Sequence, residues 1–331
     1  MSWDLRKFVR WIVEEFEPAA RVGGVRGRYA RKLGAPDIEL YGIADMACVL
    51  HTLGALRPDT SALDAWRDAF YALSDEATGY ILERAPTHGR LHNTAFALAA
   101  MNLLGIPPRY PLRFAGQYAT QQQLLTFLNK LDWQHGVYRD SHDGAGLASC
   151  MTLVPGTVPP AWFGWYFDRL DALLDPANGK LGVGKPAGGD CDQVGGTFHY
   201  AFVYEYFHRR MPHPEACIDA VLGLQQANGE WLAANPWWLT LDGMYLATRA
   251  ARHCHHRADD VRRCVRRVVA LCHERVSSQS ALRQYFEEPD LGVHTLTAAI
   301  SIFAEAQQFL GAHEVVTDWP LQLVLDRRPF I

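Results

Sequence analysis

The densest group of residues that could do chemistry lies between Gly188 and Tyr200, in the stretch GGDCDQVGGTFHY. Asp190 and Asp192 are flanked by glycine pairs, which allow a backbone to approach a ligand closely. His199 follows them, and an imidazole suits proton transfer near neutral pH. Two carboxylates in a dry cavity do not both stay charged easily, so one would have a raised pKa and act as a general acid. The structural alternative is that both aspartates cap the helix that follows.

Polar residues of the same types recur near the start of other apolar segments. Asp45 and Asp242 are helix-start aspartates, and His294, like His199, is a single histidine in an otherwise apolar helix. Each has a structural alternative, because such aspartates cap helices and such histidines are often hydrogen-bonded in the core. We predict that the catalytic residues are Asp190, Asp192, His199, Asp242, His294 and Asp45. The predicted substrate-binding residues are His92, Asn93, Gln193, Tyr200, Trp237 and Trp238, and the third segment offers His142 and Asp143.

Metal-ligand residue types gather in one further region, at His253, Cys254, His255, His256, Cys264, Cys272 and His273. Their spacing matches no closed zinc motif. A zinc ion held by Asp190 or Asp192, by Cys191 and by a histidine of the central cavity is an alternative. The sequence therefore predicts no metal site and no cofactor, and keeps zinc as the alternative.

The elements that would position these residues recur along the chain. Six apolar helical segments begin near Ala44, Thr94, Ala145, Thr197, Leu241 and His294, at intervals of 44 to 53 residues. A period in this range is typical of one supersecondary unit used repeatedly. A more amphipathic pattern precedes each segment, near residues 3–17, 62–73, 118–131, 162–174, 214–226 and 259–275. Each unit is therefore predicted to be an outer helix, a loop and an inner helix.

Six helical hairpins of this length favour an all-α fold, an (α/α)6 toroid. An open solenoid is the alternative, although the chain has no distinct polar capping repeats. Closure of the toroid would make the sixth unit a neighbour of the first. Asp192, His199, Asp242, His294 and Asp45 would then form a continuous polar arc around a central cavity.

The connections carry a few further signals. The loops between outer and inner helices, DEATGYI, WQHGVY, DPANGKL and ANGEW, each place glycine where the backbone is expected to need a positive φ. Short extended pieces are expected only around residues 80–92 and 135–140. The tail after Thr317 is expected to strap across one end of the toroid.

Composition limits the class of protein. The 331 residues are 49% hydrophobic, which is enough to bury a large core, and they are predicted to form one domain, residues 1–331.

A net charge of −4 gives no general attraction to nucleic acid. No stretch approaches the roughly 20 apolar residues that cross a bilayer, and the charged N-terminal stretch is unlike a signal peptide. Seven scattered cysteines favour free thiols in a reducing cytoplasm. A small molecule is the predicted partner, and the oligomeric state is left open.

One motif supports a resemblance to a known family. The segment from Gln225 to Trp231, QQANGEW, fits the pattern Q-x-x-x-G-x-W. The chain in this respect resembles the terpenoid cyclase and protein prenyltransferase superfamily, in which the glutamine ties off a helix end and the tryptophan stacks on it. The resemblance implies an α/α toroid. It extends less well to chemistry, because the cyclase motif D-x-D-D is matched here only by Asp190-Cys191-Asp192-Gln193, and the prenyltransferase zinc spacing is off by one.

Three functions remain open on the sequence. The first is general-acid cyclisation or isomerisation of an apolar, isoprenoid-like substrate, as the resemblance implies. The second is a carbohydrate-active toroid, meaning a sugar epimerase, lyase or glycosidase that uses Asp242, Asp45 and the histidines as acid and base. The third is a toroid that binds a ligand or a protein without catalysis. An apolar cavity with one buried carboxyl group would favour the first, and a wide polar cleft with two or more exposed carboxylates the second. A central channel filled by side chains would favour the third.

Overall fold

The computed structural model describes residues 2–83, 88–182, 189–231, 237–287 and 292–331. Over these residues the protein is all-helical, with 61% of the chain in helices, so the predicted all-α class is confirmed. Two short strands, β1 (Trp3–Asp4) and β2 (Val315–Val316), pair in parallel. No helix in the described part of the chain is both long enough and apolar enough to cross a membrane.

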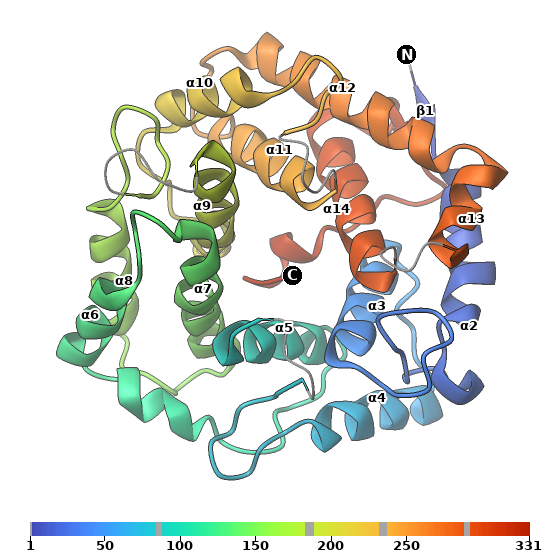
Figure 1. Cartoon of the computed structure of the whole chain (residues 1–331), viewed down its shortest axis with the longest axis horizontal. Helices are drawn as coiled ribbons and strands as arrows, with labels where there is room; N and C mark the ends of the chain where they lie inside the picture. The colour runs from blue at the N-terminus through green and yellow to red at the C-terminus, as the bar shows by residue number, and fades with distance from the viewer. Residues whose placement is uncertain (1, 84–87, 183–188, 232–236, 288–291) are drawn as a thin grey trace.

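Six helices line the inside of the molecule and are buried along most of their length. They are α3 (Leu40–Thr52), α5 (Arg90–Leu103), α7 (Val137–Leu153), α9 (Gly189–Tyr206), α11 (Trp238–Ala250) and α14 (Val293–Leu310). Each one packs against the next in this order, and α14 packs against α3. Figure 1 shows them around the centre of the molecule. Helices that are covered on both sides must be apolar nearly all round, as their sequences are.

A second set of helices lies outside the first (Figure 1). It consists of α1 (Arg6–Trp11) with the π-helical turn η1 (Ile12–Phe16) and α2 (Glu17–Ala19), α4 (Thr60–Ala72), α6 (Gln121–Lys130), α8 (Trp162–Asp171), α10 (Pro214–Leu224) and α12 (Ala258–Val276). These helices bury only one stripe. In α12, for example, Val261, Val265 and Val268 are buried while the arginines between them are exposed or half-exposed.

Several remaining elements differ from the sequence expectations. Helix α13 (Gln279–Glu287) and the two short strands were not predicted. The extended piece expected at 135–140 is wrong, because α7 begins at Val137. In the piece expected at 80–92, Ile81 forms an isolated bridge with Ser74, residues 84–87 lie outside the described residues, and α5 begins at Arg90. Three single 3-10 turns, η2 (Val22–Gly24), η3 (Arg113–Tyr118) and η4 (Val324–Asp326), complete the fold.

Three of the four glycine loops have the predicted backbone. Gly79, Gly179 and Gly229 have φ values of 79°, 62° and 100°. Each of these loops is closed by an isolated bridge of the same kind, Ser74 with Ile81, Leu174 with Leu181 and Gln225 with Trp231. The fourth loop departs from the expectation, because Gly136 has a φ of −147°. A shared turn in three units supports the repeat that the sequence pattern predicted.

The segment from Gln225 to Trp231 fastens two outer helices to each other. The Gln225 side-chain amide donates to the carbonyl of Gly229 at 3.1 Å and to the carbonyl of Cys264 in α12 at 3.2 Å. The Trp231 indole is fully buried and donates to the carbonyl of Val221 in α10 at 2.7 Å. The glutamine therefore ties the loop to the next outer helix, and the tryptophan satisfies a carbonyl near the end of α10.

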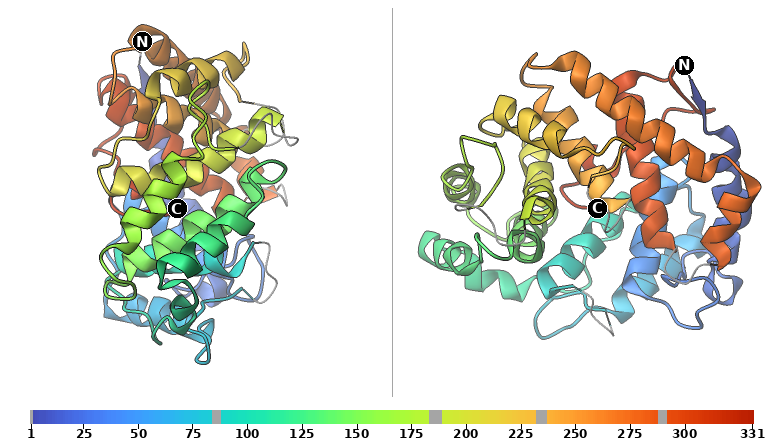
Figure 2. Two further views of the ribbon diagram at one scale, coloured as in Figure 1. Left: turned by 90° about the vertical axis from the view of Figure 1, so that its left-hand side faces the viewer. Right: turned by 45° about the horizontal axis from the view of Figure 1, so that its top comes forward.

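The C-terminal tail enters the centre of the molecule. In every view of Figures 1 and 2 the C-terminus lies among the inner helices, while the N-terminus lies at the edge. The buried Phe330 ring packs against Phe96 and Phe202, with centroids 6.4 and 5.3 Å away. Ser149 in α7 donates to the carbonyl of Pro329. The tail therefore fills the interior, and does more than cross one end as the sequence suggested.

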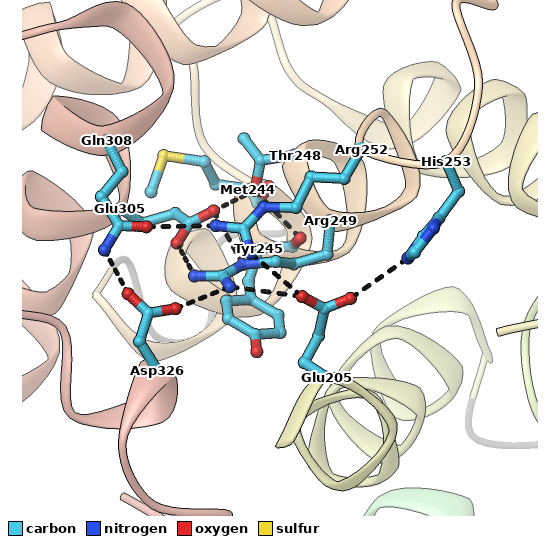
Figure 3. A network of polar contacts seen from close by, with 10 residues as sticks. All are labelled: Glu205, Met244, Tyr245, Thr248, Arg249, Arg252, His253, Glu305, Gln308 and Asp326. Atoms are coloured by element: carbon cyan, nitrogen blue, oxygen red, sulfur yellow. Dashed lines mark hydrogen bonds and ion pairs between the residues drawn. The ribbon is translucent and has the colours of Figure 1, made fainter. Parts of the chain in front are cut away.

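A buried arginine anchors this tail (Figure 3). Arg249 in α11 donates from Nε to Glu305 of α14 at 3.1 Å and from Nη1 to Asp326 of η4 at 2.8 Å. Its guanidinium also lies 3.3 Å from Glu205 of α9 and 4.4 Å above the ring of Tyr245. One side chain thus connects three inner helices and the tail.

Candidate active site

Five histidines in the described part of the chain come close together on the inner helices or just before one of them. They are His88, just before α5, His92 in its first turn, His142 in the second turn of α7, His199 in α9 and His294 in the first turn of α14. The ring centroids of His88 and His92 are 4.5 Å apart, and the His142 ring lies 4.8 Å from both. His199 is 4.9 Å from His142. We call these five residues the histidine cluster.

Tyr41 of α3 holds two of these rings. Its hydroxyl oxygen lies 2.6 Å from Nδ1 of His88 and 3.0 Å from Nδ1 of His92. The same hydroxyl donates to the side-chain oxygen of Asn93 at 3.4 Å. Because a phenol has one proton and two lone pairs, this set is satisfied when both histidines donate from Nδ1. Both imidazoles then carry their lone pair on Nε2. The edge of the Tyr41 ring also faces His294, with centroids 5.0 Å apart.

The tautomer of His199 is fixed by a serine. Ser141 donates its only hydroxyl proton to the carbonyl of Tyr138 at 2.6 Å. Its oxygen lies 2.7 Å from Nδ1 of His199, so the imidazole must be the donor in that contact. The lone pair of His199 is therefore on Nε2, and the residue can accept a proton there.

His294 forms a pair with a buried carboxylate. Its Nδ1 lies 3.2 and 3.1 Å from the two carboxyl oxygens of Asp45, which is fully buried. Trp238 covers the imidazole from the other side, with ring centroids 4.5 Å apart. An aspartate at Nδ1 orients an imidazole and stabilises its protonated form, which is the arrangement that makes Nε2 a general base in hydrolases.

Burial keeps four of the five imidazoles neutral. It lowers the pKa of His88 to about 3 and the pKa of His142 to about 4. It also moves the pKa values of His92 and His199 well below the usual value, and repulsion from neighbouring imidazoles adds to the effect. At neutral pH these side chains are therefore bases or ligands and carry no positive charge.

Asp242 of α11 supplies an acidic group, in contrast to the basic imidazoles. Its side chain is 3% exposed, and burial raises its pKa well above the usual value. Within the described part of the chain, no hydrogen-bond donor contacts its carboxyl group. A Cβ atom at Gly195 would lie 3.3 Å from its Oδ2 and 2.5 Å from the Tyr138 ring, so Asp242 and Tyr138 both lie against this glycine. The Tyr138 ring stacks on His199 at 5.4 Å and is 37% exposed, so this part of the site faces solvent.

Two predicted catalytic aspartates have structural partners. Asp192 accepts hydrogen bonds from the backbone N–H groups of Val137 and Tyr138 at 3.0 and 3.1 Å. It therefore caps the start of α7, a neighbouring helix, and holds Tyr138 in place. Asp190 is exposed and pairs with the buried ammonium of Lys180 at 3.2 Å. The capping alternative thus fits Asp192, although the helix that it caps is not its own.

Three predicted substrate-binding residues lie elsewhere. Gln193 donates to the carbonyl of Leu181 at 3.4 Å and closes its own loop. Tyr200 packs on Trp133 at 5.5 Å and faces an outer part of the molecule. Trp237 lies under the guanidinium of Arg275 from α12, at 5.4 Å.

The structure brings together seven of the predicted residues, His92, Asn93, His199, Asp242, His294, Asp45 and Trp238. It adds residues that the sequence prediction did not include, Tyr41, His88 and Tyr138. The four-residue spacing of His88 and His92 was the one available signal, because residues four apart share a helix face.

Comparisons of the chain with protein-family models, with curated proteins and with solved structures found no match. The interpretation of the site therefore depends on its geometry. That geometry combines neutral imidazoles that accept protons with a buried carboxyl group that donates one, which is the equipment of acid–base catalysis.

Proposed function

We propose that the chain forms an (α/α)6 toroid of six helical hairpins, with an active site among the inner helices. The order of contacts among the inner helices supports this, because α14 packs against α3 as well as against α11. The three matching glycine turns between outer and inner helices support it too.

We further propose that the protein is an enzyme that moves a proton to and from a carbon atom of a small hydroxylated substrate. One observation carries the proposal. The imidazole of His199 stacks on the Tyr138 ring, and Gly195 lies against both that ring and the carboxyl group of Asp242, whose pKa is raised well above its usual value by burial. A base and an acid beside one side chain can remove a proton from one face of a substrate and return it at another. In this proposal the Asp45–His294 pair is a second base.

The polar side chains of the candidate site favour a sugar-like substrate over an isoprenoid. Imidazoles of the histidine cluster and the Asn93 amide can form hydrogen bonds to hydroxyl groups, and the Trp238 ring is an aromatic surface beside them. Phe330, Phe202 and Phe96 also pack against these imidazoles, with ring centroids 4.9, 5.9 and 6.4 Å away. An isoprenoid chain, however, would leave the imidazoles without hydrogen-bond partners. The carbohydrate-active alternative is therefore preferred, with epimerisation, isomerisation or elimination next to a carbonyl or carboxylate as the reaction.

The test measures carbon-bound hydrogen in heavy water. The protein is incubated in D2O with a panel of aldoses, ketoses and uronic acids, and proton NMR follows loss of the C–H signal or appearance of a double bond. We expect wild-type protein to act on one class in the panel. His199→Gln and Asp242→Asn should each slow the reaction by about 100-fold or more.

Asp68→Asn is the matched control, because Asp68 is an exposed aspartate of the outer helix α4 and its partner Arg67 is half-exposed. It should keep the wild-type rate. The proposal is wrong if no member of the panel exchanges or eliminates, or if His199→Gln retains the full rate.

A further inference from the structure

Three imidazoles of the histidine cluster bring their ligand nitrogens together. One nitrogen from each of His88, His92 and His142 lies within 4.8 Å of the other two. The His88 and His92 rings are stacked, and the His142 ring meets both edge-on. His92 and His142 come from two adjacent inner helices, α5 and α7, and His88 lies in the turn before α5.

A tyrosine orients two of the three rings. The Tyr41 oxygen lies 2.6 Å from Nδ1 of His88 and 3.0 Å from Nδ1 of His92, and it accepts from both when its proton goes to Asn93. Histidine ligands of metals commonly donate their second ring N–H to an oxygen in this way, which fixes the tautomer and the ring orientation. A metal ion would bind the converging nitrogens, one from each ring.

The donor set indicates which ion would bind. Three neutral imidazoles without a carboxylate suit zinc and its neighbours in the first transition series, and they suit magnesium and calcium poorly because those ions prefer oxygen. Zinc lies about 2.0–2.1 Å from imidazole nitrogen, so the three nitrogens would each move inward by under about 1 Å. Three protein ligands also leave a fourth position for water or substrate, as in catalytic zinc sites.

We propose that His88, His92 and His142 bind one divalent transition-metal ion of the zinc class, with Tyr41 as the positioning residue. This site goes beyond the acid–base function proposed above, because metal binding needs no substrate. It also differs from the zinc alternative considered on the sequence. Asp190 and Asp192 are engaged with Lys180 and with the start of α7, and neither is in contact with the three histidines.

The test uses cobalt as a spectroscopic probe. The full chain is made without a polyhistidine tag, stripped with a chelator and titrated with Co²⁺ while the visible d–d absorption is recorded. Wild-type protein should bind one equivalent with the intense bands of a four-coordinate site. His142→Asn should remove that signal, and Tyr41→Phe should weaken binding by about 10-fold or more.

The matched control replaces histidines outside the cluster. A double variant, His255→Gln with His256→Gln, removes two imidazoles that lie between α11 and α12 and should leave the stoichiometry unchanged. The metal site is disproved if wild-type protein binds no Co²⁺, if His142→Asn binds it normally, or if the control variant loses it.

A second measurement needs no variant. X-ray absorption of the zinc-loaded wild-type protein counts imidazole ligands, and three are expected. Two or fewer would overturn the assignment. All of these measurements are made without substrate, so their failure leaves the acid–base proposal standing, and a failed exchange assay leaves the metal site standing.

Discussion

In the candidate site, the chemistry of a histidine depends on which ring nitrogen carries the proton. Ser141 makes His199 a donor at Nδ1, and Asp45 does the same for His294. In both cases the partner comes from a neighbouring inner helix, so the tautomer depends on helix packing. The reactive nitrogen of each imidazole is therefore set before any substrate arrives.

Glycines at helix contacts should tolerate no added methyl group. A Cβ at Gly243 in α11 would lie 2.5 Å from the ring of the fully buried Trp231. We expect Gly243→Ala to lower the free energy of unfolding by about 1–3 kcal/mol, because the indole has no room to move. Gly164→Ala in α8 is the control, since its Cβ would meet nothing within 4 Å. That change should add about 0.5–1 kcal/mol, and urea unfolding measures both.

His51 gives a pH dependence that can be measured. Burial, with a contribution from Arg328 and Arg327, lowers its pKa from 6.5 to about 4. Between these two pKa values the unfolded state binds more protons, so stability is complete above pH 6.5 and is lost as the pH falls toward 4. His51→Gln should therefore lose less stability than wild type between pH 7 and pH 4. Urea unfolding at several pH values measures this, and parallel curves would contradict it.

At the scale of elements, one buried arginine holds several of them together. Removing Arg249 leaves Glu305 buried with an unpaired charge, so Arg249→Met should cost about 3–5 kcal/mol of unfolding free energy. Arg252 contacts the same Glu205 but is half-exposed, and Arg252→Met should cost no more than about 1 kcal/mol. Denaturant unfolding compares the two. Equal losses would show that the charge at Arg249 is compensated by water.

The sequence predicts which segments are helical better than it predicts the residues at which the helices begin. Apolar periodicity located the inner helices, but α7 begins at Val137, well before the apolar run near Ala145. Its first turns contain Tyr138 and His142, which are polar because they line the site. A pattern of apolar residues therefore misses the very turns that carry function.

The site itself could be predicted only in part, because its contacts cross between elements. Asp45 and His294 were expected to meet once the sixth unit lay beside the first, and they do. Tyr41 and His88 were missed, since nothing in local sequence shows that a tyrosine hydroxyl will lie between two imidazoles. Tyr200 was included for its place beside His199, but adjacent residues on a helix point in different directions.

For the whole molecule, the tail is a part of the core. Phe330 is buried among inner helices, so Phe330→Ala should cost about 3–5 kcal/mol through lost contacts and a cavity. Trp319 belongs to the same tail but is 77% exposed, and Trp319→Ala should change stability by no more than about 0.5 kcal/mol. Thermal or urea unfolding distinguishes the two. A small effect of Phe330→Ala would mean that neighbouring side chains move into the space that the ring leaves.

The contact between α14 and α3 has a consequence for how the protein comes apart. In a linear array of repeats, the last unit has a neighbour on one side only and can peel away while the others persist. Here the first and last inner helices, α3 and α14, pack against each other. The pairing of β1 with β2 is a second contact between residues far apart in the sequence. In the proposed toroid no unit is terminal in that sense, so we expect unfolding to involve all the units together rather than to begin by fraying at one end.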